Sequence, residues 1–290
     1  MLAVLFGALA GALFGALAVA VRGGLRRGAD PEVGAIVVVG VGLAVSAVLA
    51  IPSAVVDEVS PGDLWPFLLV GALAPGASQI LLILAVRDAD PSRASILIGA
   101  TPLMSVAIAL AVLDEPIRPV LLVGTALVVV GGAVLAREPT RPEHFRVLGL
   151  LFALACAALF AIRDNVARWA ARGAHPPPLV AATVSMLAAF AIIGAYLLVV
   201  RRDTLRSRLR PAIPAFAIAG VALGLAYDSL LEAFDRGRVS IVAPLNATQS
   251  LWAVVLSVLL IGRRSEVIGV RLVAACLLIV AGGALIGAVR

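Results

Sequence analysis

Ten long apolar segments constrain this chain more than any other feature. Each runs for about 17–25 residues, which is the length that an α-helix needs to cross the roughly 30 Å hydrocarbon core of a bilayer. The polar connections between them are short, and none is long enough to form a soluble domain. The sequence therefore predicts an all-α membrane protein with ten transmembrane helices. The predicted spans are Leu2–Val21, Val33–Pro52, Leu64–Val86, Ala94–Leu113, Pro119–Ala136, Val147–Ala171, Leu179–Val200, Pro211–Phe234, Val239–Gly262 and Val267–Val289.

The composition agrees with a multi-pass protein of the cell (inner or plasma) membrane. Hydrophobic residues make up 62% of the 290 residues and charged residues only 14%, whereas soluble domains carry about a quarter charged residues. The net charge of +6 lies in short connections beside apolar segments, which is typical of membrane orientation rather than of nucleic-acid binding. Cys156 and Cys276 lie far apart in apolar segments, which favours packed thiols over a disulfide or a metal site. We expect no cofactor, no metal and no nucleic-acid partner.

The two halves of the chain resemble each other. The stretch "ALFGALAVAVRGGLRRGADP" (Ala12–Pro31) aligns with "ALFAIRDNVARWAARGAHP" (Ala158–Pro176), and both end in Arg-Gly-Ala-x-Pro. Further along, "EPIRPVLLVGTALVVVGGA" (Glu115–Ala133) aligns with "EVIGVRLVAACLLIVAGGA" (Glu266–Ala284), and both begin with Glu and end in Gly-Gly-Ala. Because the polar and glycine matches keep their order, we interpret the chain as an internal repeat.

Each half contains five predicted spans, and we place the halves at residues 1–140 and 141–290. An odd number of spans reverses the direction of the second half in the membrane. The sequence therefore predicts two inverted five-helix repeats, an architecture of secondary transporters whose substrate site lies near the bilayer midplane between the repeats.

Two stretches also resemble a known family. "ASILIGATPLMSVAIALAVLDEPIRPVLLVGTALVVVGGAVL" (Ala94–Leu135) looks like the fourth and fifth spans of the EamA group in the drug/metabolite transporter superfamily, and "GRVSIVAPLNATQSLWAVVLSVLL" (Gly237–Leu260) resembles its ninth span. The chain departs from the family pattern twice: Asp114-Glu115 replaces a Gly-Glu pair, and the tryptophan that often precedes the glycine at Gly15 is missing. We interpret Glu115, at a helix end, as structural. The resemblance implies a transporter.

Polar side chains inside the spans are the candidate site. Arg163 and Asp228 lie 16 and 17 residues from the starts of the sixth and eighth spans, or about 24–26 Å along helices that begin on the same side of the membrane. An ionisable group deep in lipid costs about 2.5–3.5 kcal/mol and usually marks a substrate or ion pathway. The candidate substrate-binding residues are Arg163 and Asp164 in the sixth span, Tyr227, Asp228 and Glu232 in the eighth, Asn246, Gln249 and Trp252 in the ninth, and Gln79 in the third.

The repeat supports a functional interpretation of these charges. The positions in the first half that match Arg163 and Asp164 are Leu17 and Ala18, and the matches of the carboxylates in the eighth span are apolar too. The scaffold therefore does not require charge at these places.

A purely structural interpretation is the alternative. Asp164 would then pair with Arg168 four residues on along the same helix, and Arg163 would extend its head group to the membrane surface. Glu232 would belong to the solvated end of the eighth span. The polar residues of the ninth span would serve helix–helix hydrogen bonding.

Our functional hypothesis is a secondary transporter that moves a small organic solute, such as an amino-acid-like zwitterion or an organic anion, by alternating access. Asp228 or Glu232 would carry a coupling proton, since burial favours the neutral form of a carboxylic acid, although exchange and uncoupled flux stay open. A flippase for a lipid-linked sugar or another amphiphile is the main alternative. A membrane-embedded enzyme is more remote, because His144 and His175 both lie in connections and the cysteines are unpaired. We expect a monomer or a homodimer.

The arginines give conflicting evidence on orientation. All 23 basic residues are arginine, and 16 of them lie in or beside the connections that follow the odd-numbered spans. The positive-inside rule then places both termini outside the cell. The family resemblance implies both termini in the cytoplasm. We give more weight to the arginine count, because it belongs to this sequence.

Overall fold

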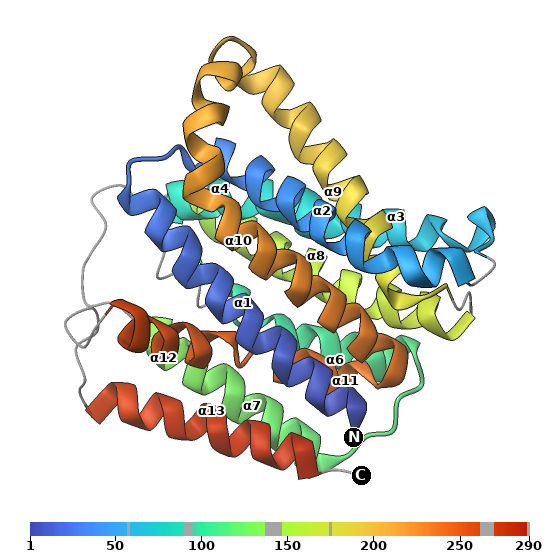
Figure 1. Cartoon of the computed structure of the whole chain (residues 1–290). Coiled ribbons are helices and arrows are strands. Elements are labelled where there is room, and N and C mark those ends of the chain that lie inside the picture. Colours follow the sequence, from blue (N-terminus) through green and yellow to red (C-terminus); the bar gives the residue numbers. More distant parts are fainter. Residues whose placement is uncertain are drawn as a thin grey trace.

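The computed structural model describes residues 1–56, 59–89, 94, 97–136, 147–173, 176–261 and 270–288, and within them the regular elements are all helical (Figure 1). The elements are α1 (Leu2–Arg26), α2 (Pro31–Val56), the 3-10 helix η1 (Pro61–Asp63), α3 (Trp65–Gly71), the π-helical turn η2 (Ala72–Ala77), α4 (Ser78–Ala89), α6 (Thr101–Val112), α7 (Pro119–Ala136), α8 (Val147–Gly173), α9 (Pro178–Val200), α10 (Arg202–Arg236), α11 (Val239–Asn246), α12 (Gln249–Ile261) and α13 (Val270–Ala288).

Seven helical segments in the described part of the chain are long and apolar enough to cross a membrane, which confirms the prediction of an all-α, multi-pass protein. They are Leu2–Arg26, Pro31–Val55, Pro61–Ala85, Val147–Gly173, Pro178–Val200, Ser207–Arg236 and Val239–Leu260. The fourth, fifth and tenth predicted spans coincide with shorter apolar helices, Thr101–Val112, Pro119–Val134 and Ala274–Ile286. Parts of the fourth and tenth predicted spans lie outside the described residues, as does the predicted boundary between residues 140 and 141.

Three of the predicted spans are interrupted, and each of them contains proline. The third is divided into α3, η2 and α4, and Ala74 inside η2 is extended (φ −151°, ψ 126°) directly before Pro75. The fourth begins α6 after a turn at residues 99–100, with Pro102 in its first helical turn, and the ninth is divided into α11 and α12 by a turn at residues 247–248. Proline inside a helix lacks an N–H group and collides with the preceding turn, which accounts for the break before Pro75. Pro102 instead lies at the start of α6, where proline is tolerated.

Helices from the two halves pack mainly against each other. The most extensive contacts pair α1 with α10, α7 with α13, α2 with α10, α4 with α8, and α2 with α9. The first and sixth spans are repeat mates, as are the third and eighth, so α1 against α10 and α8 against α4 are the same contact with the halves exchanged. The packing therefore has the two-fold pattern that a repeat predicts.

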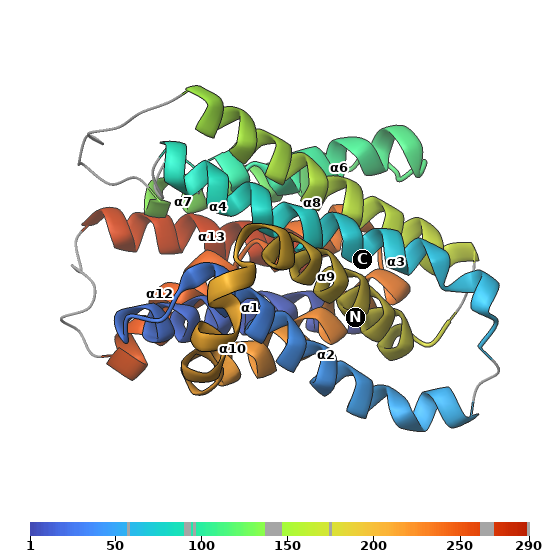
Figure 2. The same cartoon turned by 90° about the horizontal axis from the view of Figure 1, so that it is seen from above.

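The repeat mates run in opposite directions. Figures 1 and 2 show α1 and α8 lying antiparallel, while the first turn of α1 and the last turn of α13 lie at the same end of the bundle. This arrangement agrees with the predicted inversion of the second half.

Glycine allows one close helix crossing, between α1 and α12. A Cβ atom on Gly15 of α1 would lie 2.6 Å from the Cβ of Trp252 and 2.8 Å from the backbone N of Ala253 in α12. Such distances are closer than atoms can approach, so α1 and α12 require glycine here. Gly11 is as close to the end of α11 and the turn after it, with a Cβ at 2.9 Å from the carbonyl of Leu245, whereas a Cβ on Gly7 would lie at an ordinary 3.5 Å from Leu245.

Candidate substrate site between the repeats

An ion pair lies buried in the middle of the bundle. Arg163 and Asp164 of α8 are each only 3% exposed, and the Nε of Arg163 lies 2.9 Å from the Oδ1 of Asp164. The hydroxyl of Ser105 in α6 donates a hydrogen bond of 2.9 Å to the other carboxylate oxygen. The partner of Asp164 is therefore its neighbour Arg163, and the alternative pairing with Arg168 is wrong.

Aromatic rings cover the guanidinium of Arg163. Its central carbon lies 5.4 Å from the ring centroid of Phe160 and 5.6 Å from that of Tyr227 on α10, distances at which a cation is attracted to the ring face. The hydroxyl of Tyr227 donates a hydrogen bond to the carbonyl of Ala74, the extended residue in the interrupted third span. Tyr227 thus connects the break in the first half to the cation of the second half.

Asn165 ties α8 to the fourth predicted span. Its side-chain amide donates hydrogen bonds to the carbonyls of Ser105 (3.1 Å) and Ala161 (2.9 Å). Its carbonyl oxygen is buried and accepts none within the described residues. Ser105 therefore contacts both Asp164 and Asn165. Nothing in the sequence singles it out, because a serine in an apolar helix commonly bonds to its own backbone.

Asp228 of α10 is buried without a partner. The residue is 5% exposed, and neither carboxylate oxygen accepts a hydrogen bond from the residues that the structure describes. Ser46 of α2 lies beside it and is fully buried, but the two groups do not reach hydrogen-bond geometry. A buried carboxylate without a donor is costly, so a proton or a ligand is needed to satisfy it.

The structure does not bring the remaining candidates to this cluster. Glu232 is paired with Arg236 one turn along α10 (Nε to Oε2, 2.8 Å). This pairing favours the structural interpretation of Glu232. Gln79 and Asn246 are partly buried, Gln249 is exposed and Trp252 is 37% exposed. Within the described chain, no hydrogen bond or ion pair connects any of them to Arg163.

Two further charged residues close helix ends. Glu115 is 4% exposed and accepts hydrogen bonds from the backbone N–H groups of Val239 (2.8 Å) and Ser240 (3.0 Å) at the start of α11, where a carboxylate is favoured. Arg168 donates to the carbonyls of Phe234 and Asp235, both at 2.7 Å, at the end of α10. These contacts agree with a structural role for Glu115.

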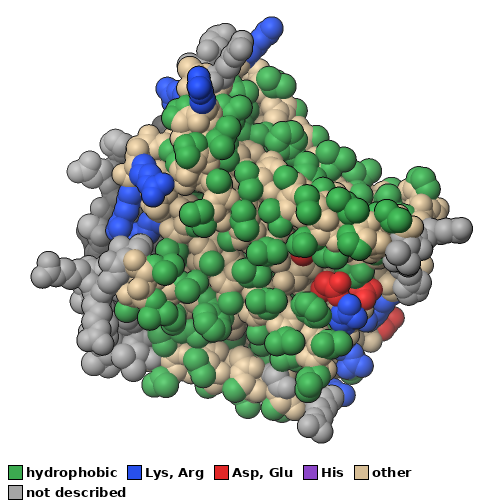
Figure 3. Space-filling model, in the orientation of Figure 1, with side chains coloured by type: hydrophobic (Ala, Val, Ile, Leu, Met, Phe, Trp, Pro, Cys, Tyr) green, Lys and Arg blue, Asp and Glu red, His purple; other side chains and the backbone are tan. Residues whose placement is uncertain are grey.

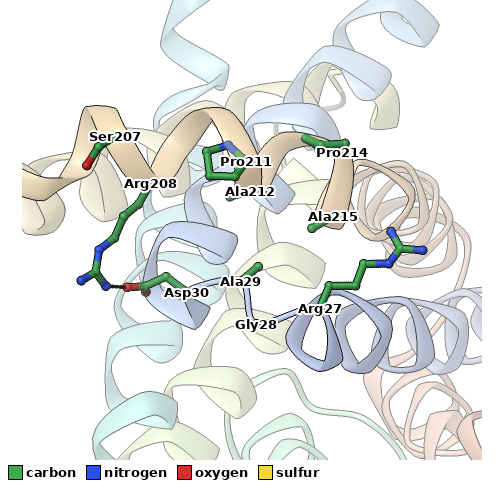
Figure 4. A pocket seen from close by; sticks show the side chains of 10 residues that line it. All are labelled: Arg27, Gly28, Ala29, Asp30, Ser207, Arg208, Pro211, Ala212, Pro214 and Ala215. Atoms are coloured by element: carbon green, nitrogen blue, oxygen red, sulfur yellow. Dashed lines mark hydrogen bonds and ion pairs between the residues drawn. The ribbon is translucent and has the colours of Figure 1, made fainter.

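A cavity of about 360 Å³ lies elsewhere, between the turn after α1 and the start of α10 (Figure 4). Pro211 in its wall is separated from Asp228 by 17 residues of α10, or about 26 Å of helix. We place the candidate substrate site at the buried charges rather than in this cavity. Among the described residues, no group of three or more His, Cys, Asp and Glu side chains could hold a metal ion.

Comparison with known proteins identifies the family. A solved crystal structure superposes on 98% of this chain and 95% of its own chain with a TM-score of 0.79, at 22% sequence identity, which shows a shared fold. No curated protein matches the chain. The sequence pattern of the EamA-like transporter family matches residues 1–137 and 147–288, that is, each half in turn. The chain therefore belongs to the EamA-like transporter family.

Proposed function

We propose that the protein is a secondary transporter with ten membrane spans, which moves a small ammonium-bearing solute across the cell membrane by alternating access. The observation that carries this proposal is the buried, unpartnered carboxylate of Asp228, which directly follows Tyr227, the residue whose ring covers Arg163. Interrupted helices at a repeat interface are where such transporters bind their substrates.

The arrangement of charge favours an amino-acid-like zwitterion over a purely anionic solute. The guanidinium of Arg163 is already paired and covered by two rings, so it offers little to an anion unless Asp164 moves. Asp228 has two free acceptor oxygens, which suit an ammonium group. The carboxylate of the same solute would reach Arg163 only on movement of Asp164 away from it.

A proton is the alternative occupant of Asp228 when no substrate is bound. A carboxylate that is buried without donors is more stable as the neutral acid. Because Asp228 would bind either a proton or the ammonium group of the solute, it would couple the flux of protons to the flux of solute. Coupling by competition for a single carboxylate requires no second ionisable group. It therefore assigns the coupling proton to Asp228 and not to Glu232, whose carboxylate is paired with Arg236.

Asp228→Asn tests this assignment in proteoliposomes that are loaded with a panel of labelled amino acids, amines and organic anions. The variant keeps the side-chain shape but cannot ionise. We expect it to fold and to lose both proton-driven accumulation and exchange of the ammonium-bearing solute, because one carboxylate serves both steps. Glu232→Gln, with the same change of charge one turn away, should keep at least half of the activity. Undiminished transport by Asp228→Asn would exclude the proposed site, and translocation of labelled lipid instead of solutes would indicate a flippase.

A further inference from the structure

The cavity at the start of α10 has no part in the proposed transport site. It lies between the turn that joins α1 to α2 and the first turns of α10, as Figure 4 shows. Its lining residues are Arg27, Gly28, Ala29, Asp30, Ser207, Arg208, Pro211, Ala212, Pro214 and Ala215.

The cavity lies where helices leave the membrane. The apolar part of α10 begins at Pro211 and that of α1 ends at Val21, so the lining residues stand at the boundary between hydrocarbon and head groups. At about 1.5 Å per residue, the 35 residues of α10 extend for about 52 Å and must project beyond the hydrocarbon core. Phosphate groups of lipids lie at this level.

The charged groups of the cavity leave one cation free. Asp30 is paired with Arg208 and also accepts hydrogen bonds from the backbone N–H groups of Glu32 (3.0 Å) and Val33 (3.3 Å). Burial opposes its ionisation, but these donors together hold the pKa of Asp30 below its ordinary value. The guanidinium of Arg27 is exposed and, in the part of the chain that the structure describes, makes no ion pair or hydrogen bond.

The rest of the lining is apolar. Two prolines and two alanines of α10 form one wall (Figure 4), and Figure 3 shows arginine side chains along the same edge of the molecule. An apolar wall with a free arginine at head-group depth matches a molecule that joins a phosphate to hydrocarbon. A soluble anion would not use the wall.

We infer that this cavity binds the head group of an anionic glycerophospholipid, whose phosphate contacts Arg27 while its glycerol backbone lies against the prolines of α10. Basic pockets between membrane helices at this depth suit such lipids. The Asp30–Arg208 pair forms the far wall. The inference is independent of the transported solute.

The test is lipid-dependent stability in nanodiscs of phosphatidylcholine, with and without added phosphatidylglycerol. A ligand that binds only the folded state raises the unfolding temperature, so phosphatidylglycerol should raise it for the parent protein. Arg27→Gln should need about fivefold more phosphatidylglycerol for the same rise, since one arginine near the membrane surface contributes about 1 kcal/mol. Its unfolding temperature in pure phosphatidylcholine should equal that of the parent, which verifies folding.

Arg26→Gln is the matched control, because Arg26 is the preceding residue and does not line the cavity. It should respond to phosphatidylglycerol as the parent does. If Arg26→Gln weakened the response to phosphatidylglycerol as much as Arg27→Gln does, the lipid would be attracted to a basic surface in general. That result would overturn the inference. So would a full response to soluble glycerol phosphate in pure phosphatidylcholine, which would assign the cavity to a free phosphate compound.

Discussion

Helices α1 and α8 hold equivalent places in the two repeats, yet they have opposite chemistry at the same depth. Three small residues at four-residue spacing, Gly7, Gly11 and Gly15, line the packed face of α1. At the offset of 146 residues their counterparts in α8 are three alanines, at 153, 157 and 161, all fully buried. Both helices therefore have a row of small residues on the packed face, which we call the packing stripe. The next turn of α8 holds Arg163–Asp164–Asn165, which is buried, whereas residues 17–19 of α1 are apolar and partly or fully exposed.

This difference separates what the scaffold needs from what the site needs. Small residues recur in both helices because both must approach neighbouring helices closely. At the positions of this triplet, charge occurs in α8 only, and the charged residues lie deeper in the protein than their apolar counterparts in α1. A fold that builds the same helix without charge does not depend on charge for its architecture, so the polar triplet of α8 is an addition to the scaffold.

The largest effect should come from breaking the buried ion pair. Arg163→Leu leaves Asp164 buried without its cation and should cost about 3–5 kcal/mol of unfolding free energy. The double change Arg163→Leu with Asp164→Leu removes both charges and imitates α1, so it should recover most of that stability while transport stays absent. Thermal unfolding in detergent and uptake in proteoliposomes measure the two properties.

Leu17→Ala in α1 is the matched control for this pair of experiments. It should leave uptake nearly intact, with a small loss of stability from the shortened side chain. If Leu17→Ala abolished uptake in folded protein, or if the double variant were no more stable than Arg163→Leu, the distinction between the two helices would fail.

A second, smaller effect concerns the arginines that lie one turn beyond the triplet. Arg168 donates two hydrogen bonds of 2.7 Å to carbonyls at the end of α10, whereas its counterpart Arg22 has an exposed side chain. Hydrogen bonds to a charged group contribute about 1.5–3 kcal/mol. Arg168→Gln should lower the free energy of unfolding by that amount, and Arg26→Gln, at an exposed arginine in the last turn of α1, by less than about 0.5 kcal/mol. Equal losses would show that the two hydrogen bonds of Arg168 add nothing to stability.

The smallest effect tests the shared stripe. Gly15→Ala places a methyl group within 3 Å of the α12 backbone and should cost about 1–3 kcal/mol through overpacking. Gly23→Ala on the same helix has no atom within 4 Å of the added methyl and should be neutral or slightly stabilising. Melting curves of the two variants decide whether Gly15 is required for packing. A harmless Gly15→Ala would remove the reason for glycine at this crossing.

Most of the fold could be predicted from the sequence. A bilayer requires helices of a fixed length, and long apolar runs in the sequence identify them. The division of the third span could not be placed by hydropathy, since Pro75 and its neighbours are as apolar as the helix around them. The length of α10 was underestimated for a related reason. Its first nine residues, from Arg202 to Arg210, are polar and helical outside the apolar stretch.

The site was predictable only in part. Depth along the helices selected Arg163 and Asp228, and both are buried. The structure brings Asp164 and Tyr227 to Arg163. Side-chain pairing was not accessible in this way, because it depends on rotamers and on helices distant in sequence. The assignment of Asp164 to Arg163, the hydroxyl of Ser105 and the position of Ser46 all required coordinates.

The pairing of helices across the two halves also bears on how the chain is made. Helices α1 and α2 both make their most extensive contacts with α10, and α7 makes its most extensive contacts with α13. During synthesis, the faces of the first-half helices that later contact the second half are therefore exposed to lipid until the second half has been inserted. Contacts this distant in sequence close late, so maturation of the first repeat is completed only when the last helix has been inserted.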